Sequence, residues 1–211
     1  MSEPFVITER PSVYLASKSP RRQDLLRQLG IDFVELKLRE APGREPDVVE
    51  APREAEAPQE YVKRVARLKA SVAWHRMTRR SLPPKPVLAA DTEVVLEGRV
   101  LGKPKDPADA IAMLSALSGQ THEVFTAVAV RWEAQLALGV SSSRVSFRAL
   151  PKDEIERYIA TGEPFDKAGA YAIQGRAAAF IRHLEGSYSG VMGLPLFETA
   201  EILAKIGYQV L

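Results

Sequence analysis

The sequence contains no cysteine. This absence excludes disulfide bridges, thiolate metal sites and cysteine nucleophiles, and it fits a cytoplasmic protein. No apolar run approaches the roughly 18 residues that a membrane-spanning helix needs. The first 12 residues lack the charged and apolar regions of a signal peptide. We therefore expect a cytoplasmic protein that makes no contact with a membrane.

An excess of one charge is also lacking, since 29 Lys and Arg residues against 27 Asp and Glu residues give a formal net charge of +2. This charge is too small to indicate a nucleic-acid partner, so any basic function must be local. The three histidines show no ligand spacing, which argues against a zinc site. The 211 residues suit one large α/β domain or two small lobes. We interpret residues 1–12 as a short N-terminal extension and residues 13–211 as a single domain.

Hydrophobic periodicity predicts helices and strands that alternate along the chain, with several neighbouring strands joined as hairpins. The predicted strands are 13–16, 87–90, 122–132, 136–150, 178–184 and 208–211, with a hairpin over 93–101. The predicted helices are 20–29, 59–77, 106–119, 151–162 and 195–206. The segment 39–59, rich in Pro, Glu and Ala, is predicted to be a surface loop. This order favours a mixed sheet flanked by helices over an all-parallel sheet.

The stretch SKSPRR at residues 17–22 places two arginines in the first turn of a helix. Ser19 is a suitable N-cap and Pro20 a suitable first residue. A helix N-terminus already carries positive partial charge, so Arg21 and Arg22 are unfavourably placed unless an anion binds there. Backbone N–H groups, the hydroxyls of Ser17 and Ser19 and two guanidiniums would suit a phosphate. The alternative is that both arginines are solvated and pair with nearby acids.

Two lysines support the interpretation as a phosphate site. Lys69 falls near the predicted apolar stripe of its helix, which comprises Val62, Val65, Leu68 and Val72. A lysine at this position can also snorkel without any function. Lys103 lies in a turn after a strand, and a lysine in a loop does not by itself indicate a function.

Acidic side chains complete the set. Asp91 and Thr92 follow an apolar strand, and open α/β sheets bind their ligands at strand ends, although such an Asp can also be a turn former. Glu50 lies in the otherwise featureless loop. Carboxylates beside phosphates suggest Mg²⁺ or Mn²⁺. In DKAGAYAIQG at 166–175, the charged pair contributes Lys167, and the amide of Gln174 could recognise a base edge.

The chain resembles the Maf family of nucleoside triphosphate pyrophosphatases from about residue 13 to residue 206. The matching segments are LASKSPRRQDLL (15–26), DVVE (47–50), YVKRVARLKA (61–70), AADTEVV (89–95), LGKP (101–104), GQTHEVFTAVAV (119–130), DKAGAYAIQG (166–175) and GSYSGVMGLPL (186–196). The form DKAGAYAIQG resembles the branch that acts on dTTP and UTP. A related branch acts on 7-methyl-GTP. DVVE stands where DIDE is more typical, and Glu50 is placed by counting back from Tyr61.

The resemblance implies an elongated mixed α/β fold similar to that of inosine triphosphate pyrophosphatases, with a cleft between two lobes. It implies hydrolysis of a nucleoside triphosphate to the monophosphate and pyrophosphate, with Asp91 as the catalytic base. Glu50 and Asp91 would hold Mg²⁺ or Mn²⁺. The implied substrate-binding residues are Ser17, Ser19, Arg21, Arg22, Lys69, Thr92, Lys103, Lys167 and Gln174. The family further suggests a homodimer and a link to septum formation.

Three other functions stay open at this point. The protein could act on 7-methyl-GTP or on a broader range of nucleotides. It could also be a regulator of cell division that binds a nucleotide without turnover, although such a module would not need the acids Glu50 and Asp91. A nucleic-acid binder using the basic segment 75–85 is the weakest alternative, because that segment lacks interleaved aromatic residues.

Overall fold

The computed structural model describes residues 12–39 and 46–210, so the predicted extension lies, apart from Ser12, outside the described residues. The strands are β1 (Ser12–Leu15), β2 (Asp32–Glu35), β3 (Val87–Leu96), β4 (Arg99–Val100), β5 (Thr121–Trp132), β6 (Gln135–Phe147) and β7 (Ile181–Glu185). The α-helices are α1 (Pro20–Gln28), α2 (Pro58–Arg79), α3 (Pro107–Leu117), α4 (Lys152–Ile159), α5 (Tyr188–Met192) and α6 (Leu196–Lys205). Two 3₁₀ helices, η1 (Ala168–Ala170) and η2 (Arg176–Phe180), complete the described part.

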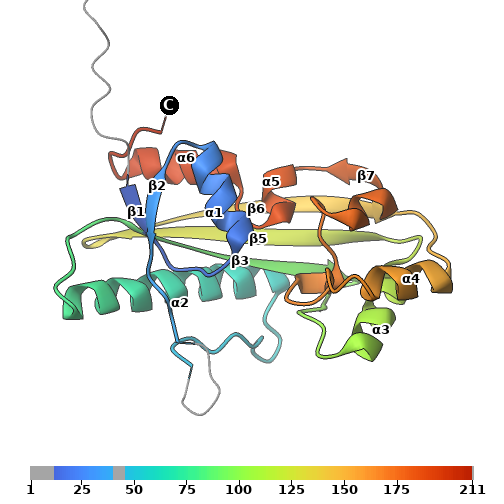
Figure 1. Cartoon of the computed structure of the whole chain (residues 1–211). Helices are drawn as coiled ribbons and strands as arrows, with labels where there is room; N and C mark the ends of the chain where they lie inside the picture. Colours follow the sequence, from blue (N-terminus) through green and yellow to red (C-terminus); the bar gives the residue numbers. More distant parts are fainter. Residues whose placement is uncertain (1–11, 40–45, 211) are drawn as a thin grey trace, which may run out of the picture.

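The strands form one seven-stranded sheet in the order β2-β1-β3-β5-β6-β7, with β4 paired to β3. The pairs β1–β2 and β1–β3 are parallel, while β3–β5, β5–β6 and β6–β7 are antiparallel. In Figure 1 the long strands run through the middle of an elongated molecule, with α2 along one face and α1 and α6 over the other. The prediction of an α/β fold with an elongated mixed sheet flanked by helices is confirmed.

Successive residues of β3 lie on opposite faces of the sheet and pack against different helices. Val87 and Ala89 pack in a cluster with α2, whereas Leu88 and Ala90 pack in a cluster with α1 and α6. A third cluster joins the far parts of the long strands to α3 and α4, and it includes Val94 of the same strand. The molecule therefore has two packed lobes that share β3, β5 and β6.

The prediction that Asp91 ends a strand is wrong. Asp91 lies in the middle of β3, which continues to Leu96. The register explains why a site can form there: β1 pairs with β3 only as far as Leu88, and β4 pairs with β3 only from Val95. Between these two partners the edge of β3 has no strand beside it among the described residues. The polar segment Asp91–Glu93 therefore lies where a ligand can approach the sheet.

The predicted apolar stripe of α2 is wrong at Leu68, whose exposed fraction is 39%, and Lys69 is buried instead, with 9% exposed. The face that packs on the sheet includes Ala66, Ala70 and Ala73, which are fully buried. Small side chains allow a helix to approach a sheet closely, and they carry little weight in a pattern of large apolar residues. The ammonium group of Lys69 is thereby enclosed rather than snorkelled to solvent.

Two smaller predictions near the C-terminus also need correction. The segment predicted as a strand over 178–184 begins as η2, and the strand itself is β7. Residues 208–210 do not form the predicted closing strand, while residue 211 lies outside the described residues. Tyr208 instead packs edge-to-face on Trp132, so an alternating apolar pattern that looks like a strand serves side-chain packing here.

A buried histidine gives the fold an acid-sensitive point. His122 is 2% exposed, and burial lowers its pKa to about 4. In the unfolded chain this histidine would bind a proton near its ordinary pKa of about 6.5. In the folded chain it binds a proton only near its lowered pKa of about 4. The free energy of unfolding therefore falls as the pH drops from about 6.5 to about 4. Over this pH range, we expect the free energy of unfolding to fall by up to about 3 kcal/mol less in the His122→Phe variant than in the wild-type protein. Urea unfolding at pH 7 and pH 4.5 measures it, and equal pH dependence in both proteins would contradict the assignment.

Candidate active site

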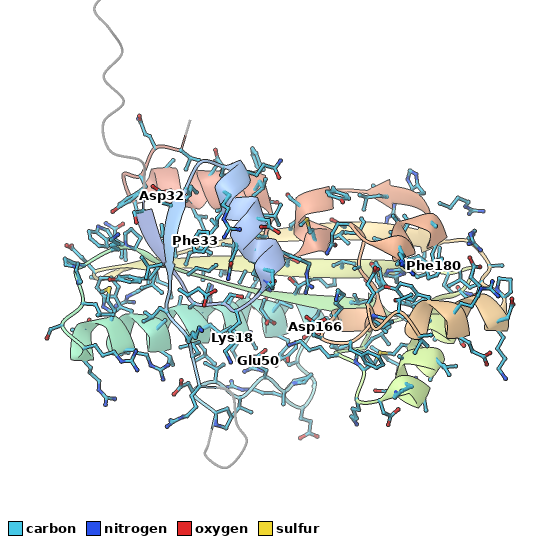
Figure 2. All side chains as sticks on the ribbon, in the orientation of Figure 1. Lys18, Asp32, Phe33, Glu50, Asp166 and Phe180 are labelled. Carbon is cyan, nitrogen blue, oxygen red and sulfur yellow. The ribbon has the colours of Figure 1, made fainter. Side chains whose placement is uncertain are left out.

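A cleft of about 1130 Å³ lies between the two lobes, against the free edge of β3. Ligand pockets are typically ~300–1,000 Å³, so the cleft is large enough for a nucleotide. Every residue that the sequence marks as a candidate for substrate, catalysis or metal lines it: Ser17, Ser19, Arg21, Arg22, Glu50, Lys69, Asp91, Thr92, Lys103, Lys167 and Gln174. In Figure 2 the labelled side chains Lys18, Glu50 and Asp166 lie in the middle of the molecule, whereas Phe180 lies in the right-hand lobe.

Arg22 is held in place by three hydrogen bonds from different parts of the chain. Its Nε donates to the carbonyl of Gly193 (2.7 Å), and its two terminal nitrogens donate to Ser17 Oγ (3.2 Å) and Thr92 Oγ1 (3.2 Å). Thr92 Oγ1 also lies 3.0 Å from Thr126 Oγ1, which donates to a carbonyl on α5. Burial lowers the pKa of Arg22, and the charge of Asp91 opposes that effect. The guanidinium is therefore pre-oriented in the lining of the cleft.

The N-terminus of α1 is a candidate anion site. Ser19 is the N-cap and Pro20 opens the helix, as predicted, but the Ser19 side chain makes no capping hydrogen bond and the first turn carries no acid. The backbone N–H of Ser19 donates to Ser17 Oγ (3.2 Å). Arg21 reaches across the cleft, where its guanidinium lies 3.8 Å from a carboxylate oxygen of Asp166. A phosphate can therefore meet uncapped N–H groups and two arginines here.

Lys69 joins the two acidic candidates. Its Nζ lies 2.8 Å from Glu50 Oε2 and 2.8 Å from Asp91 Oδ1. Glu50 comes from the loop before α2, so the structure places this glutamate beside Asp91 even though their separation in the chain is 41 residues. The side chain of Asp91 is 7% exposed and that of Glu50 is 40% exposed. One ammonium thus bridges a buried carboxylate and a carboxylate at the mouth of the cleft.

The carboxylates fit a hard divalent cation. Asp91 Oδ2 is buried and has no hydrogen-bond partner, so it can accept a further contact. Oxygen donors of this kind suit Mg²⁺ and Mn²⁺, which usually take one or two protein carboxylates together with water and phosphate oxygens. Within residues 12–39 and 46–210, no three acidic, histidine or cysteine side chains form a cluster that could enclose a metal ion.

The remaining candidates lie at the second lobe. Lys103 follows β4 and is exposed, and Gln174 is exposed in the turn Ala172–Gly175. Lys167 Nζ lies 2.8 Å from Asp166 Oδ1. These three residues line the same cleft as the N-terminus of α1.

The sequence did not reveal several further lining residues. Glu93, two residues after Asp91 on the same face of β3, has a buried Oε2 with no partner. Burial raises its pKa to about 8, and the charge of Asp91 adds to this. Lys18, Lys105 and Tyr61 also line the cleft. The alternating pattern of β3 would have identified Glu93 as a neighbour of Asp91 if the strand had been predicted to continue beyond Ala90. No local pattern marks the other three residues.

In the described part of the chain, seven cationic side chains and four carboxylates line the cleft. An uncapped helix N-terminus, clustered cations and a buried carboxylate in one cleft of an α/β protein are features typical of a polyphosphate-binding site. The chain matches the family described as "Maf-like protein" over residues 12–206. It belongs to this family, as the sequence motifs predicted.

Curated relatives agree with the family match. A protein of Nitrosomonas europaea named dTTP/UTP pyrophosphatase is 54% identical over 94% of this chain and 96% of that protein. A protein of Nitrosospira multiformis with the same name is 56% identical over 94% of this chain and 96% of its own length. The solved structure of the Staphylococcus aureus Ham1 protein overlaps 64% of this chain and 71% of that chain, with 12% identity and a TM-score of 0.42. No helix among the described residues is long and apolar enough to span a membrane.

Proposed function

We propose that this protein is a nucleoside triphosphate pyrophosphatase that hydrolyses dTTP and UTP to the monophosphate and pyrophosphate. The observation that carries the proposal is that the anion site of α1 and the Glu50–Lys69–Asp91 group meet in one cleft. Membership of the Maf family and relatives named dTTP/UTP pyrophosphatase support it. A module that only bound phosphate would need the cations but not a buried, half-partnered carboxylate such as Asp91.

Side chains from both lobes would bind the triphosphate. Arg22, fixed by three hydrogen bonds, can contact phosphate oxygens without losing much side-chain freedom on binding. Arg21 can release Asp166, because an ion pair of 3.8 Å with a 67% exposed carboxylate contributes little. Lys103 and Lys167 can approach the phosphates from the opposite side. Such a clamp neutralises charge that builds up as pyrophosphate leaves.

A divalent cation completes this scheme as a proposed cofactor, with Glu50 and Asp91 as the residues that would hold it. When bound, Mg²⁺ or Mn²⁺ would neutralise phosphate charge and favour deprotonation of a nearby water. Lys69 now lies between the two carboxylates, so its ammonium group would move toward the phosphates when the cation is present. We propose that Asp91 accepts a hydrogen bond from the attacking water and orients it toward the α-phosphorus.

Base recognition is assigned to Gln174, together with Arg21 and Thr92, which set the position of the nucleotide. The exposed amide of Gln174 offers two donors and one acceptor toward the edge of a pyrimidine. We expect Gln174→Ala to lower the ratio of kcat/KM for dTTP to kcat/KM for GTP by about 10-fold, the size of one lost hydrogen bond. Steady-state kinetics with both nucleotides measure this ratio. An unchanged preference among dTTP, UTP and GTP would contradict the role of Gln174.

Pyrophosphate release from a panel of nucleoside triphosphates tests the proposed function. Each nucleotide is assayed with Mg²⁺, with Mn²⁺ and with EDTA, and 7-methyl-GTP is included as the substrate of the related branch. Release that needs a cation and is fastest with dTTP or UTP supports the proposal. Faster release with another nucleotide would keep the reaction and reject the pyrimidine preference. Tight binding without any release would support a regulator instead.

The cellular setting follows from the proposed substrate. We place the protein in the cytoplasm, where nucleoside triphosphates are made and used, and we expect neither a nucleic-acid nor a membrane partner. Removal of excess or non-standard pyrimidine nucleotides before a polymerase uses them would be its task. We also propose a homodimer, on the basis of the family resemblance alone, and light scattering on the purified protein would test it.

A further inference from the structure

A single glutamate anchors the turn that carries Gln174. Glu163, in the loop after α4, accepts a hydrogen bond at Oε2 from the backbone N–H of Arg176 (3.1 Å) and at Oε1 from that of Ala177 (3.4 Å). These are the first two residues of η2, so the carboxylate caps this short helix from a distant part of the chain. Tyr158 donates its hydroxyl to Glu163 Oε1 (2.9 Å) from α4. The carboxylate is therefore fixed by three donors immediately after the turn.

The glycine that follows Gln174 leaves room for this carboxylate. A Cβ at Gly175 would lie 2.3 Å from Glu163 Oε1, and the φ of Gly175 is −106°, which other residues can adopt. Glycine at this position therefore leaves room for the close approach of the Glu163 carboxylate. The backbone N–H of Gly175 donates to the carbonyl of Ala172 (3.1 Å), which closes the turn with Gln174 inside it.

The other end of the turn is anchored in the core. Tyr171 is 5% exposed, and its hydroxyl lies 2.9 Å from His122 Nε2. Ala172 and Ile173 are buried as well, and Gln174 is the first exposed residue of the segment. Gln174 thus lies between a core anchor on its N-terminal side and Glu163 on its C-terminal side. The core anchor holds the chain before Gln174, and Glu163 accepts hydrogen bonds from the backbone of Arg176 and Ala177 after it.

From this geometry we propose that Glu163 is a positioning residue for nucleotide choice, because it holds the turn in the orientation that presents the Gln174 amide to the base. The inference rests on the proposed function, since it deepens the role of Gln174. Glu163 does not line the cleft, so it would act through the turn and not by contact with the substrate. Its loss would free the start of η2 and let the amide take several orientations.

A double-mutant cycle tests this proposal. The readout is the ratio of kcat/KM for dTTP to kcat/KM for GTP within each variant, because this ratio does not depend on how much of the protein is folded. We expect Glu163→Ala to lower the ratio by roughly 10-fold and to have no further effect in the Gln174→Ala background. We expect Gly175→Ala to lower it as well, since the new Cβ displaces the carboxylate, and to have little effect once Glu163 is Ala. Glu156→Ala, an exposed glutamate on α4, is the matched control with an unchanged ratio.

The outcomes separate this inference from the proposed function. If Gln174→Ala lowers the ratio and Glu163→Ala does not, the positioning role is wrong while base recognition by Gln174 stands. If Glu163→Ala lowers the ratio by the same factor with and without Gln174, the glutamate acts by another route and the proposal is overturned. If Gln174→Ala leaves the ratio unchanged, both assignments fail together. Pyrophosphate release by the wild-type protein shows independently whether the reaction itself is correct.

Discussion

Replacement of Asp91 by Asn is expected to lower kcat for dTTP by about 10²- to 10⁴-fold, the usual contribution of a group that manages the proton of an attacking water. Asp91 is 5% exposed, its Oδ1 is 2.8 Å from Lys69 Nζ, and its Oδ2 is buried without a partner. Asparagine keeps the shape but turns one acceptor into a donor and removes the charge that faces Lys69. The loss should therefore lie mostly in kcat rather than in KM.

The matched control is Asp32→Asn, an exposed aspartate on β2 that does not line the cleft and that Figure 2 shows apart from the labelled Glu50 and Asp166. We expect this variant to keep wild-type kcat and KM. Circular dichroism of the Asp91→Asn protein checks that the fold is intact, and the remaining bond to Glu50 should keep Lys69 in place. Near-wild-type turnover by a folded Asp91→Asn protein would refute an essential role for this carboxylate.

Replacement of Arg22 by Ala is expected to lower kcat/KM for dTTP by about 10²- to 10³-fold, as is typical when one pre-oriented donor to a developing charge is lost. The guanidinium is fixed to Ser17, Thr92 and Gly193, so its removal also takes one hydrogen bond from the hydroxyl of Thr92. Arg22→Lys should restore little, because an ammonium group cannot reproduce the planar set of three donors.

Arg27→Ala serves as the control for this prediction. Arg27 lies on the same helix, but it is exposed and pairs with Asp24 at 2.7 Å on the outer surface. We expect Arg27→Ala to change kcat/KM by less than a factor of about 2, since exposed pairs are worth little. Steady-state kinetics with dTTP compare the two variants. Equal losses of kcat/KM in Arg22→Ala and Arg27→Ala would mean that the overall positive charge of the protein, and not the anion site of α1, governs the binding of dTTP.

The sequence was sufficient to predict the overall architecture because its main signals are local. The start of α1 at Ser19 and Pro20 and the long hairpin β5–β6 follow from capping residues and from alternation. The same local rules misplaced Asp91 at a strand end. Whether a strand continues through polar residues depends on its neighbours: β5 pairs with β3 along the whole segment Val87–Val95, and this pairing keeps Asp91 in the strand.

The candidate residues chosen from the sequence line one cleft, but their arrangement in it was not predicted. A family resemblance could number Glu50, yet only the fold shows that Lys69 bridges it to Asp91. The burial of Lys69 escaped prediction because its buried neighbours on α2 include Ala66, Ala70 and Ala73, which carry little weight in a pattern of large apolar residues. Glu163 carried no signal at all, because its proposed role arises from hydrogen bonds with the backbone of Arg176 and Ala177 that no spacing in the chain reveals.

Product analysis with dTTP tests the central claim most directly. The protein is incubated with dTTP and Mg²⁺ in ¹⁸O-labelled water, and the products are separated and weighed by mass spectrometry. The account predicts dTMP that carries the label, together with unlabelled pyrophosphate, because water attacks the α-phosphorus in the cleft beside Asp91. Formation of dTDP and phosphate, or label in the pyrophosphate, would contradict this account of the site.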